Sequence, residues 1–368
     1  MQSETVPQSM KRAAHDQLGC GILCPDSCHQ RTSAFGCAIV GHQSSLYRGY
    51  DNDIRSIRGQ QVAIGKSKKK KVISYLYQRW LDDDLPEGIA YRTDVTNAIK
   101  ATGADLSVGN AANFLKDMIR KKNAVENWPD ELIAARVSAR QRYGNERVLQ
   151  FFTYPEEWPS PFPDFHAPDN DTPIYTSQSV SIDALARSLG RSEESWLTQI
   201  AVNLNLVQTQ LALFSIPTLR GRLRDVRHLQ MSIKTQPEID AAFVATYKTE
   251  SVGVHDNVFI TLEAKQRDER ILIDQIREQV AKAFEITAHL NDPPIHAVKA
   301  LALQVVKWKV NTKHENMIFL VEFQRISRSE FNANYGVTMD SELIYSMKME
   351  EVSATLYRLE PAIPALGS

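Results

Sequence analysis

The chain has 368 residues, of which 43% are hydrophobic and 24% are charged, and its formal net charge is −1. This composition is typical of a globular protein, and the length predicts two domains. No apolar run approaches the roughly 20 residues that span a bilayer, and the N-terminus is polar and basic where a signal peptide is apolar. We therefore expect a cytoplasmic protein that makes no membrane contact.

Charge is distributed unevenly along the chain. Residues 1–150 contain 22 Lys and Arg against 16 Asp and Glu, whereas residues 151–368 contain 21 against 28. A basic front half suits a nucleic-acid-binding domain, and an acidic rear half suits a metal-binding one. The asymmetry alone does not decide the function.

Residues 1–65 show no sustained periodicity, which predicts a poorly ordered segment. All the cysteines of the chain fall here, so the remainder is not a disulfide-built secreted fold. They are Cys20, Cys24, Cys28 and Cys37. With His29 and His42 they could bind zinc, but their spacing differs from the C-x2-C pairs of zinc knuckles and ribbons. A zinc site and an unstructured tail both remain open.

A run of lysines precedes the first helical pattern. It consists of Lys68, Lys69, Lys70 and Lys71, with Lys66 just before it. Such a run is either a solvated linker or a segment that binds nucleic-acid phosphates without sequence specificity.

Three helical patterns follow the lysines. Apolar residues recur at three- and four-residue spacing over residues 72–80, and a second helix fits residues 93–102. Ser107 then caps a third helix, whose last turn carries Arg120 and two lysines.

Two strand-like runs over residues 136–154, separated by a Gly-Asn pair, complete the first domain. Three helices followed by a β-hairpin predict a small winged helix-turn-helix domain at residues 66–154. Its third helix would be the recognition helix, with Arg140 and Arg142 on or near the wing as DNA contacts. Amphipathic helices with basic ends also occur in proteins that never bind DNA.

A linker and a second domain occupy the rest of the chain. Six prolines fall within residues 155–173, and they predict a linker over residues 155–180. Residues 181–368 alternate helical and strand patterns, which predicts an α/β domain with a mixed sheet. The predicted helices cover residues 181–190, 192–214 and 269–284, and the predicted strands cover residues 227–235, 238–249, 258–265, 300–310 and 317–326.

One predicted strand carries two opposite charges at its end. Residues 258–262 read Val-Phe-Ile-Thr-Leu, and Glu263-Ala264-Lys265 follow. Because side chains alternate along a strand, Glu263 and Lys265 lie on the same face. Buried charge is expensive, so this pair is either a structural salt bridge or part of a chemical site.

The preceding predicted strand also contains an acidic residue, Asp240. If residues 253–257 form a hairpin turn, Asp240 lies beside Glu263. Two carboxylates that lie so close repel each other when ionised, unless a divalent cation lies between them. The two strands therefore predict a metal site.

These residues resemble a known family. Pro237-Glu238-Ile239-Asp240 and Glu263-Ala264-Lys265 resemble the signature of PD-(D/E)xK nucleases, and the element order over residues 192–326 is similar to the αβββαβ core of that fold. The Pro-Asp pair of the family becomes Pro-Glu-Ile-Asp here, and we assign the Asp role to Asp240. Asp256 is a poorer candidate because it falls in the predicted turn.

The resemblance implies a Mg2+-dependent, site-specific endonuclease of the type II restriction kind, which hydrolyses phosphodiester bonds of double-stranded DNA. Asp240, Glu263 and the Ala264 carbonyl would bind the metal, which would polarise the scissile phosphate and lower the pKa of a bound water. Lys265 would orient that water and offset charge in the transition state.

Other residues are secondary candidates for the same function. Glu194 is one, because an acidic residue of the preceding helix often joins such sites, and Gln266 has an open role after the Lys-bearing strand. A basic cluster upstream of the core is either a phosphate contact or a solvated helix end. It consists of Arg220, Arg222, Arg224 and Arg227.

The partners implied are double-stranded DNA, a cognate DNA methyltransferase and a second copy of the chain, because cutting a palindrome needs two related sites. Three alternatives stay open. The protein could be a nuclease of DNA repair or of a mobile element, or a winged-helix regulator with an inactive nuclease-like domain. It could also be an unrelated α/β protein in which Glu263 and Lys265 form a structural salt bridge.

Overall fold

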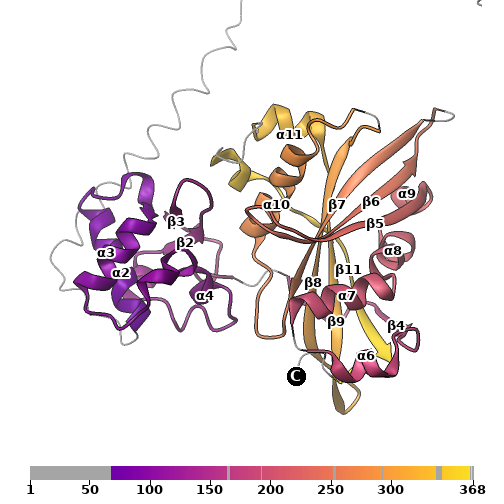
Figure 1. Ribbon diagram of the computed structural model, residues 1–368, viewed down its shortest axis with the longest axis horizontal. Coiled ribbons are helices and arrows are strands. Elements are labelled where there is room, and N and C mark those ends of the chain that lie inside the picture. The colour runs from indigo at the N-terminus through magenta and orange to yellow at the C-terminus, as the bar shows by residue number, and fades with distance from the viewer. Residues whose placement is uncertain are drawn as a thin grey trace, which may run out of the picture. The chain divides into compact units, whose positions relative to one another are not determined.

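The computed structural model describes residues 68–163, 166–191, 193–251, 254–291, 293–336, 342–364 and 366. Over these residues the protein is a mixed α/β structure with two separate β-sheets (Figure 1). The candidate zinc ligands lie outside the described residues; these are Cys20, Cys24, Cys28, His29, Cys37 and His42. Along the described part of the chain, no helix has both the length and the apolar surface that a membrane crossing requires.

The front part of the described chain is a group of short helices around a three-stranded antiparallel sheet with the order β1-β3-β2. In chain order its elements are α2 (Lys68–Leu81), η2 (Pro86–Gly88), β1 (Ile89–Tyr91), α3 (Arg92–Ala101), η3 (Val108–Asn113), α4 (Lys116–Ile119), α5 (Asp130–Ala134), β2 (Val137–Gln141) and β3 (Arg147–Thr153).

The packing of α2 follows from its sequence pattern. Val72, Ile73 and Leu76 are buried because the helical repeat brings them to one face. Trp80 stacks on Phe151 of β3, with the two ring centroids 5.6 Å apart. The predicted first helix is therefore present, and it extends back over the lysine run.

The predicted recognition helix is not one continuous helix. After Ser107 the chain forms the 3-10 helix η3, and the short helix α4 follows. The Ser107 side chain makes no capping hydrogen bond. Gly109 and the asparagines of this segment have low helix propensity, which explains the short and tight turns.

The predicted Pro-rich linker contains a strand at its end. β4 (Ile174–Gln178) pairs in parallel with β11 (Glu351–Glu360), so that Tyr175 lies opposite Tyr357. The local pattern did not indicate this strand because it is short and the strand with which it pairs lies near the other end of the sequence. The end of the predicted linker thus belongs to the large sheet.

The large sheet has eight strands, with the order β4-β11-β9-β8-β7-β6-β5 and with β10 beside β8. β7 and β8 are parallel, as are β4 and β11, and the other neighbours are antiparallel. Between β4 and β11 the chain forms α6 (Ala184–Leu189), α7 (Glu194–Asn203), α8 (Leu206–Thr209), the π-helix η4 (Gln210–Phe214), α9 (Pro217–Arg220), β5 (Leu223–Ile233), β6 (Ile239–Lys248), β7 (His255–Lys265), α10 (Ile273–Ile286), β8 (Ala297–Val310), β9 (Lys313–Phe323), β10 (Ile326–Ser327), α11 (Arg328–Asn334) and η5 (Glu342–Ser346).

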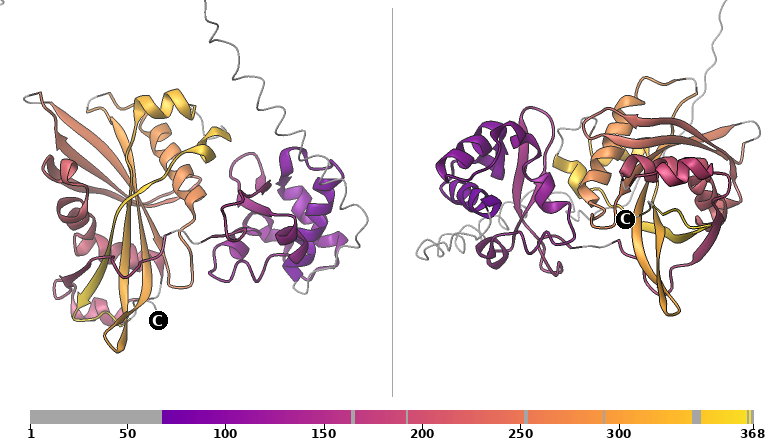
Figure 2. Two further views of the ribbon diagram at one scale, coloured as in Figure 1. Left: turned by 180° about the vertical axis from the view of Figure 1, so that it is seen from behind. Right: turned by 60° about the horizontal axis from the view of Figure 1, so that its bottom comes forward.

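Helices cover both faces of this sheet, and each face has its own hydrophobic core (Figure 2). Leu197 of α7 packs in one core and Ile276 of α10 packs in the other. Successive residues of β7 point to opposite faces, so Ile260 joins the first core and Phe259 the second. This alternation also decides which face receives the charged end of β7.

The predicted helix over residues 192–214 is divided into α7, α8 and η4. The break falls at Asn205, which has a left-handed backbone with φ of 53°. Asparagine tolerates this conformation better than most residues, because its side chain can form local hydrogen bonds. The apolar pattern continued across the break and therefore gave no sign of it.

Candidate active site

The candidate site lies where β6, β7 and α10 meet. In the pairing of β6 with β7, Ala241 lies opposite Leu262, and the antiparallel register then brings Asp240 to the position beside Glu263. The Asp240 Oδ2 atom accepts a hydrogen bond of 2.8 Å from the backbone N–H of Ala264. The expected hairpin therefore brings the three predicted metal-binding residues together.

Glu263 is buried and held from two directions. Its side chain is 2% exposed, and its carboxylate accepts hydrogen bonds from Lys265 and from two α10 amides, those of Gln275 and Gln279. These amides were not among the predicted site residues. Their signal in the sequence is a polar pair, four residues apart, that interrupts an otherwise amphipathic helix.

Lys265 is also buried, with a side chain that is 1% exposed. Its Nζ atom is paired with Glu263 and lies 3.3 Å from a carboxylate oxygen of Glu194. Burial lowers the pKa of Lys265, but the two carboxylates outweigh burial, and the pKa is raised above its ordinary value. The amine is therefore charged and has a fixed position.

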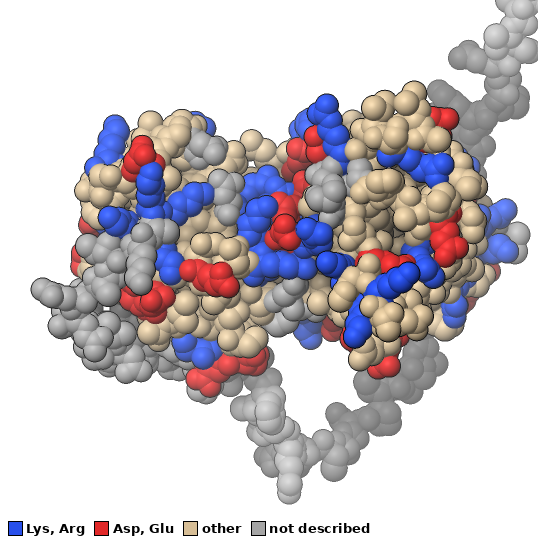
Figure 3. Space-filling view, turned by 90° about the horizontal axis from the view of Figure 1, so that it is seen from below, with Lys and Arg blue, Asp and Glu red and all other residues tan. Residues whose placement is uncertain are grey.

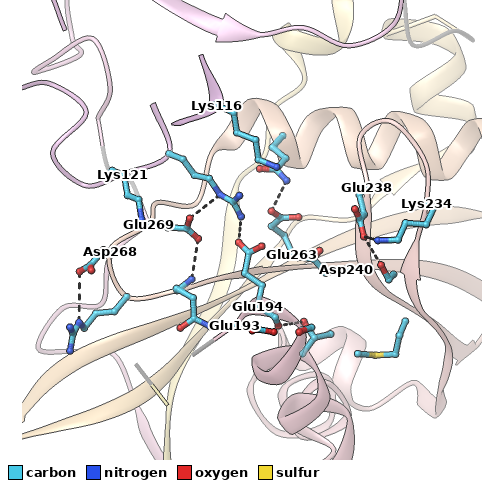
Figure 4. Close-up of a pocket in the computed structure, with 18 residues that line it drawn as sticks. Lys116, Lys121, Glu193, Glu194, Lys234, Glu238, Asp240, Glu263, Asp268 and Glu269 are labelled. Carbon is cyan, nitrogen blue, oxygen red and sulfur yellow. Dashed lines mark hydrogen bonds and ion pairs between the residues drawn. The ribbon is translucent and has the colours of Figure 1, made fainter. Parts of the chain in front are cut away.

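A cleft of about 770 Å³ is lined by Asp240 and Glu263 but not by Lys265 (Figure 4). Its acidic lining residues are Glu193, Glu194, Glu238, Asp240, Glu263, Asp268 and Glu269. Its basic lining residues are Lys116, Arg120, Lys121, Lys234 and Arg267. A cleft with this mixture can hold a cation at its acidic side and an anion such as a phosphate at its basic rim.

The acidic side of the cleft fits Mg2+. Within the described residues, no group of three or more His, Cys, Asp or Glu side chains is placed to hold a metal. Mg2+ does not need such a group, because it keeps several waters and is often bound by one or two carboxylates together with substrate phosphate. Asp240 and Glu263 supply the carboxylates here. Burial, and next the negative charge of Glu263, raise the pKa of Asp240 to about 8, so this carboxyl group binds a proton at neutral pH.

The raised pKa of Asp240 predicts how the free energy of unfolding depends on pH. Burial also raises the pKa of Glu278, on α10, to about 8. Both pKa values lie above those of the same groups in an unfolded chain, which are about 4. The protonated carboxyl groups therefore contribute their full stabilisation below about pH 4, and this stabilisation is lost as the pH rises through about 8. We expect the free energy of unfolding of the metal-free protein, measured with urea, to fall between pH 6 and pH 9. An equal or larger value at pH 9 would contradict this, and Glu278→Gln should make the dependence shallower.

Three secondary candidates have different outcomes. Glu194, the first residue of α7, lines the cleft and contacts Lys265, and Gln266 lines the cleft as well. Asp256 is part of β7 and not of a turn, and it is paired with Arg325 at 2.5 Å. Asp256 does not line the cleft.

The lysine run forms the first turn of α2 and is not a linker. Lys68 is paired with Asp105 at 2.7 Å, and both side chains are largely exposed. Lys70 lies 3.7 Å from Asp130, and the Lys69 amine lies over the Phe114 ring. Exposed ion pairs are weak, so an exposed lysine such as Lys68 can give up its carboxylate partner and bind a phosphate instead.

The prediction that Arg140 and Arg142 contact DNA disagrees with their positions. The Arg142 side chain is 2% exposed and pairs with Glu342 at 2.5 Å. The Arg140 guanidinium lies over the rings of Phe152 and Tyr345, 4.2 Å from each centroid. Arg140 also lies 3.6 Å from Asp274, so carboxylates remote in sequence neutralise both arginines within the protein.

The second basic cluster lies at the surface. Arg220, Arg222 and Arg224 are all exposed, at the end of α9 and the start of the edge strand β5. Arg222 donates a 2.7 Å hydrogen bond to the Lys248 carbonyl, and Arg220 donates one of the same length to the Leu213 carbonyl. These contacts anchor the side chains without neutralising their charge.

A second buried Lys–Glu pair offers a comparison inside the same sheet. Lys299 of β8 and Glu322 of β9 are paired, with side chains 1% and 0% exposed. Glu322 also accepts hydrogen bonds from Ser215 and Ser353. Of these two pairs, Glu263 alone lines the cleft, whereas Lys265, Lys299 and Glu322 do not. Access of the Glu263 carboxylate to the cleft therefore distinguishes the two pairs.

Comparisons with protein-family models, with curated proteins and with solved structures found no match to this chain.

Proposed function

We propose that the protein is a Mg2+-dependent endonuclease for double-stranded DNA with a PD-(D/E)xK core. The observation that carries the proposal is the meeting of Asp240, Glu263 and Lys265 on two neighbouring strands, with the two carboxylates lining an open cleft. The order α7, β5, β6, β7, α10, β8, with β7 parallel to β8, agrees with the αβββαβ order of that family.

Each residue has a role that its surroundings support. Asp240, Glu263 and the Ala264 carbonyl would hold Mg2+, which would polarise the scissile phosphate and acidify a bound water. Gln275 and Gln279 keep the Glu263 carboxylate in place. Lys265 keeps its positive charge among carboxylates and offsets the negative charge that develops on the phosphate.

The front part is proposed as a winged-helix DNA-binding domain. In its support, the order α2, β1, α3, third helical segment, β2, β3 is similar to that of a winged helix, although the third segment is the broken pair η3 and α4 and the short helix α5 precedes β2. Lys116 and Arg120 of this segment line the cleft. A helical segment that binds DNA here would hold the duplex beside the proposed catalytic residues.

The surface charge also supports a polyanionic substrate. Figure 3 shows Lys and Arg side chains gathered near the middle of the face seen from below, around a smaller group of acidic side chains. DNA is bound largely through its phosphates. A restriction role adds a second copy of the chain and a cognate methyltransferase to the proposed partners.

Incubation with DNA tests the proposed function. We expect plasmid and phage DNA to yield discrete fragments with Mg2+ and to stay intact with EDTA. Intact DNA in both conditions, over a range of sequences and methylation states, would rule out the endonuclease. Cleavage of only mismatched or branched duplexes would favour a repair role over restriction.

Affinity for duplex DNA should depend strongly on salt. Neutralising Arg222 and Arg224 together should reduce the slope of log K against log salt by about 2, because each phosphate contact releases about one counterion. Fluorescence anisotropy with Ca2+ in place of Mg2+ measures this without cleavage. Arg358→Ala, which removes an arginine paired with Glu315, is the matched control and should leave the slope unchanged.

A further inference from the structure

Arg120, in the front part of the chain, reaches the carboxylates of the proposed active site. Its guanidinium is paired with Glu194 and lies 3.2 Å from a carboxylate oxygen of Glu269. The same Glu194 oxygen lies 3.3 Å from the Lys265 amine. One carboxylate oxygen thus links the Arg120 side chain to Lys265.

Backbone hydrogen bonds fix Arg120 in this place. The N–H of Arg270 donates to the Arg120 carbonyl, and the N–H of Lys122 donates to the Asp268 carbonyl, both at 2.9 Å. The Arg270 side chain also donates to the Ile119 carbonyl. The segment after α4 is therefore tied to the loop that directly follows Lys265.

We propose that Arg120 is a positioning residue of the active site, which couples the DNA-binding part of the chain to cleavage. This inference rests on the proposed endonuclease function. Arg120 neutralises Glu194 and Glu269 and so leaves the charge of Lys265 directed to Glu263 and to the phosphate. Its position beside a carboxylate that contacts Lys265 assigns it an indirect role.

The alternative charge balance explains the expected defect. Without Arg120, Lys265 would be the nearest cation for both Glu194 and Glu263, and Glu269 would face Glu194 with no cation between them. The Lys265 amine would then be drawn toward Glu194 and away from the reacting phosphate. DNA binding would change little, because the phosphate contacts at the surface remain.

Single-turnover cleavage with saturating duplex DNA and Mg2+ tests this. We expect Arg120→Ala to slow cleavage by about 100-fold, the effect of a displaced Lys265 amine that no longer contacts the transition state, with DNA affinity within about 3-fold in Ca2+. Arg120→Lys should recover most of the rate. Adding Glu269→Gln to Arg120→Ala should recover at least 10-fold, because it removes the unbalanced charge without adding a contact.

Arg358→Ala is the matched control, since it removes an arginine that is paired with Glu315 and does not line the cleft. It should cleave at the wild-type rate. Wild-type cleavage by Arg120→Ala, or no recovery by Glu269→Gln, would overturn the positioning role while the endonuclease stands. A wild-type protein that does not cleave would overturn both. Circular dichroism shows whether each variant is folded, and Arg120→Lys provides the test if Arg120→Ala is not.

Discussion

Replacing Lys265 with Met should slow DNA cleavage by about 100-fold to 1000-fold, because a charge partner of the transition state is lost. DNA binding should persist, and Mg2+ binding should persist because both carboxylates remain. Stability should fall as well, since removing one partner of a buried ion pair costs about 3–5 kcal/mol. Single-turnover cleavage and urea unfolding of the same preparation measure the two effects separately.

Lys299→Met is the control that the fold itself provides. Lys299 and Lys265 are equally buried and each is paired with a glutamate, so both variants should lose a similar amount of stability. Only Lys265→Met should lose the cleavage rate measured on folded protein. If both variants cleave DNA at the wild-type rate, Lys265 is a structural ion-pair partner, and the proposed site has to be abandoned.

Asp240→Asn should abolish detectable Mg2+ binding and reduce cleavage by about 100-fold or more, because one carboxylate alone makes a poor site for this ion. The same change should stabilise the metal-free protein above pH 8. There the wild-type carboxyl, with its pKa of about 8, must ionise beside Glu263, whereas the amide stays neutral and can still accept the Ala264 hydrogen bond.

Calorimetric titration with Mg2+ and thermal unfolding at pH 9 measure these two effects. The expected rise in Tm is about 2–4 °C, the shift that ~1 kcal/mol produces in a domain of this size. Asp256→Asn is the matched control, because Asp256 is paired with Arg325 and does not line the cleft. Normal Mg2+ affinity in Asp240→Asn would remove Asp240 from the metal site.

The same variants separate the remaining functions. A winged-helix regulator with an inactive nuclease-like domain should bind DNA with steep salt dependence and show no Mg2+-dependent cleavage. An unrelated α/β protein should do neither, and Lys265→Met would then affect only stability. The proposed nuclease differs from the unrelated α/β protein in its need for a cleft beside the carboxylates, because a purely structural pair such as Lys299 and Glu322 needs no opening.

The parts of the site that depend on local geometry could be predicted from the residues alone. Alternation along one strand puts Glu263 and Lys265 on one face, and a hairpin joining neighbouring strands puts Asp240 beside them. The helix after that strand and the mixed sheet could also be predicted, because their apolar patterns are strong. These features depend only on contacts between neighbouring segments.

Contacts between residues far apart in the sequence could not be predicted and are known from the tertiary structure. Arg120 and Glu194 lie 74 positions apart, and Arg142 and Glu342 lie 200 apart. No local pattern shows which carboxylate will neutralise an arginine, so Arg142 resembled a DNA contact and is instead a buried anchor. The physical reason is that charge pairing in a folded protein depends on distance in space and on burial, and a linear pattern of residues encodes neither.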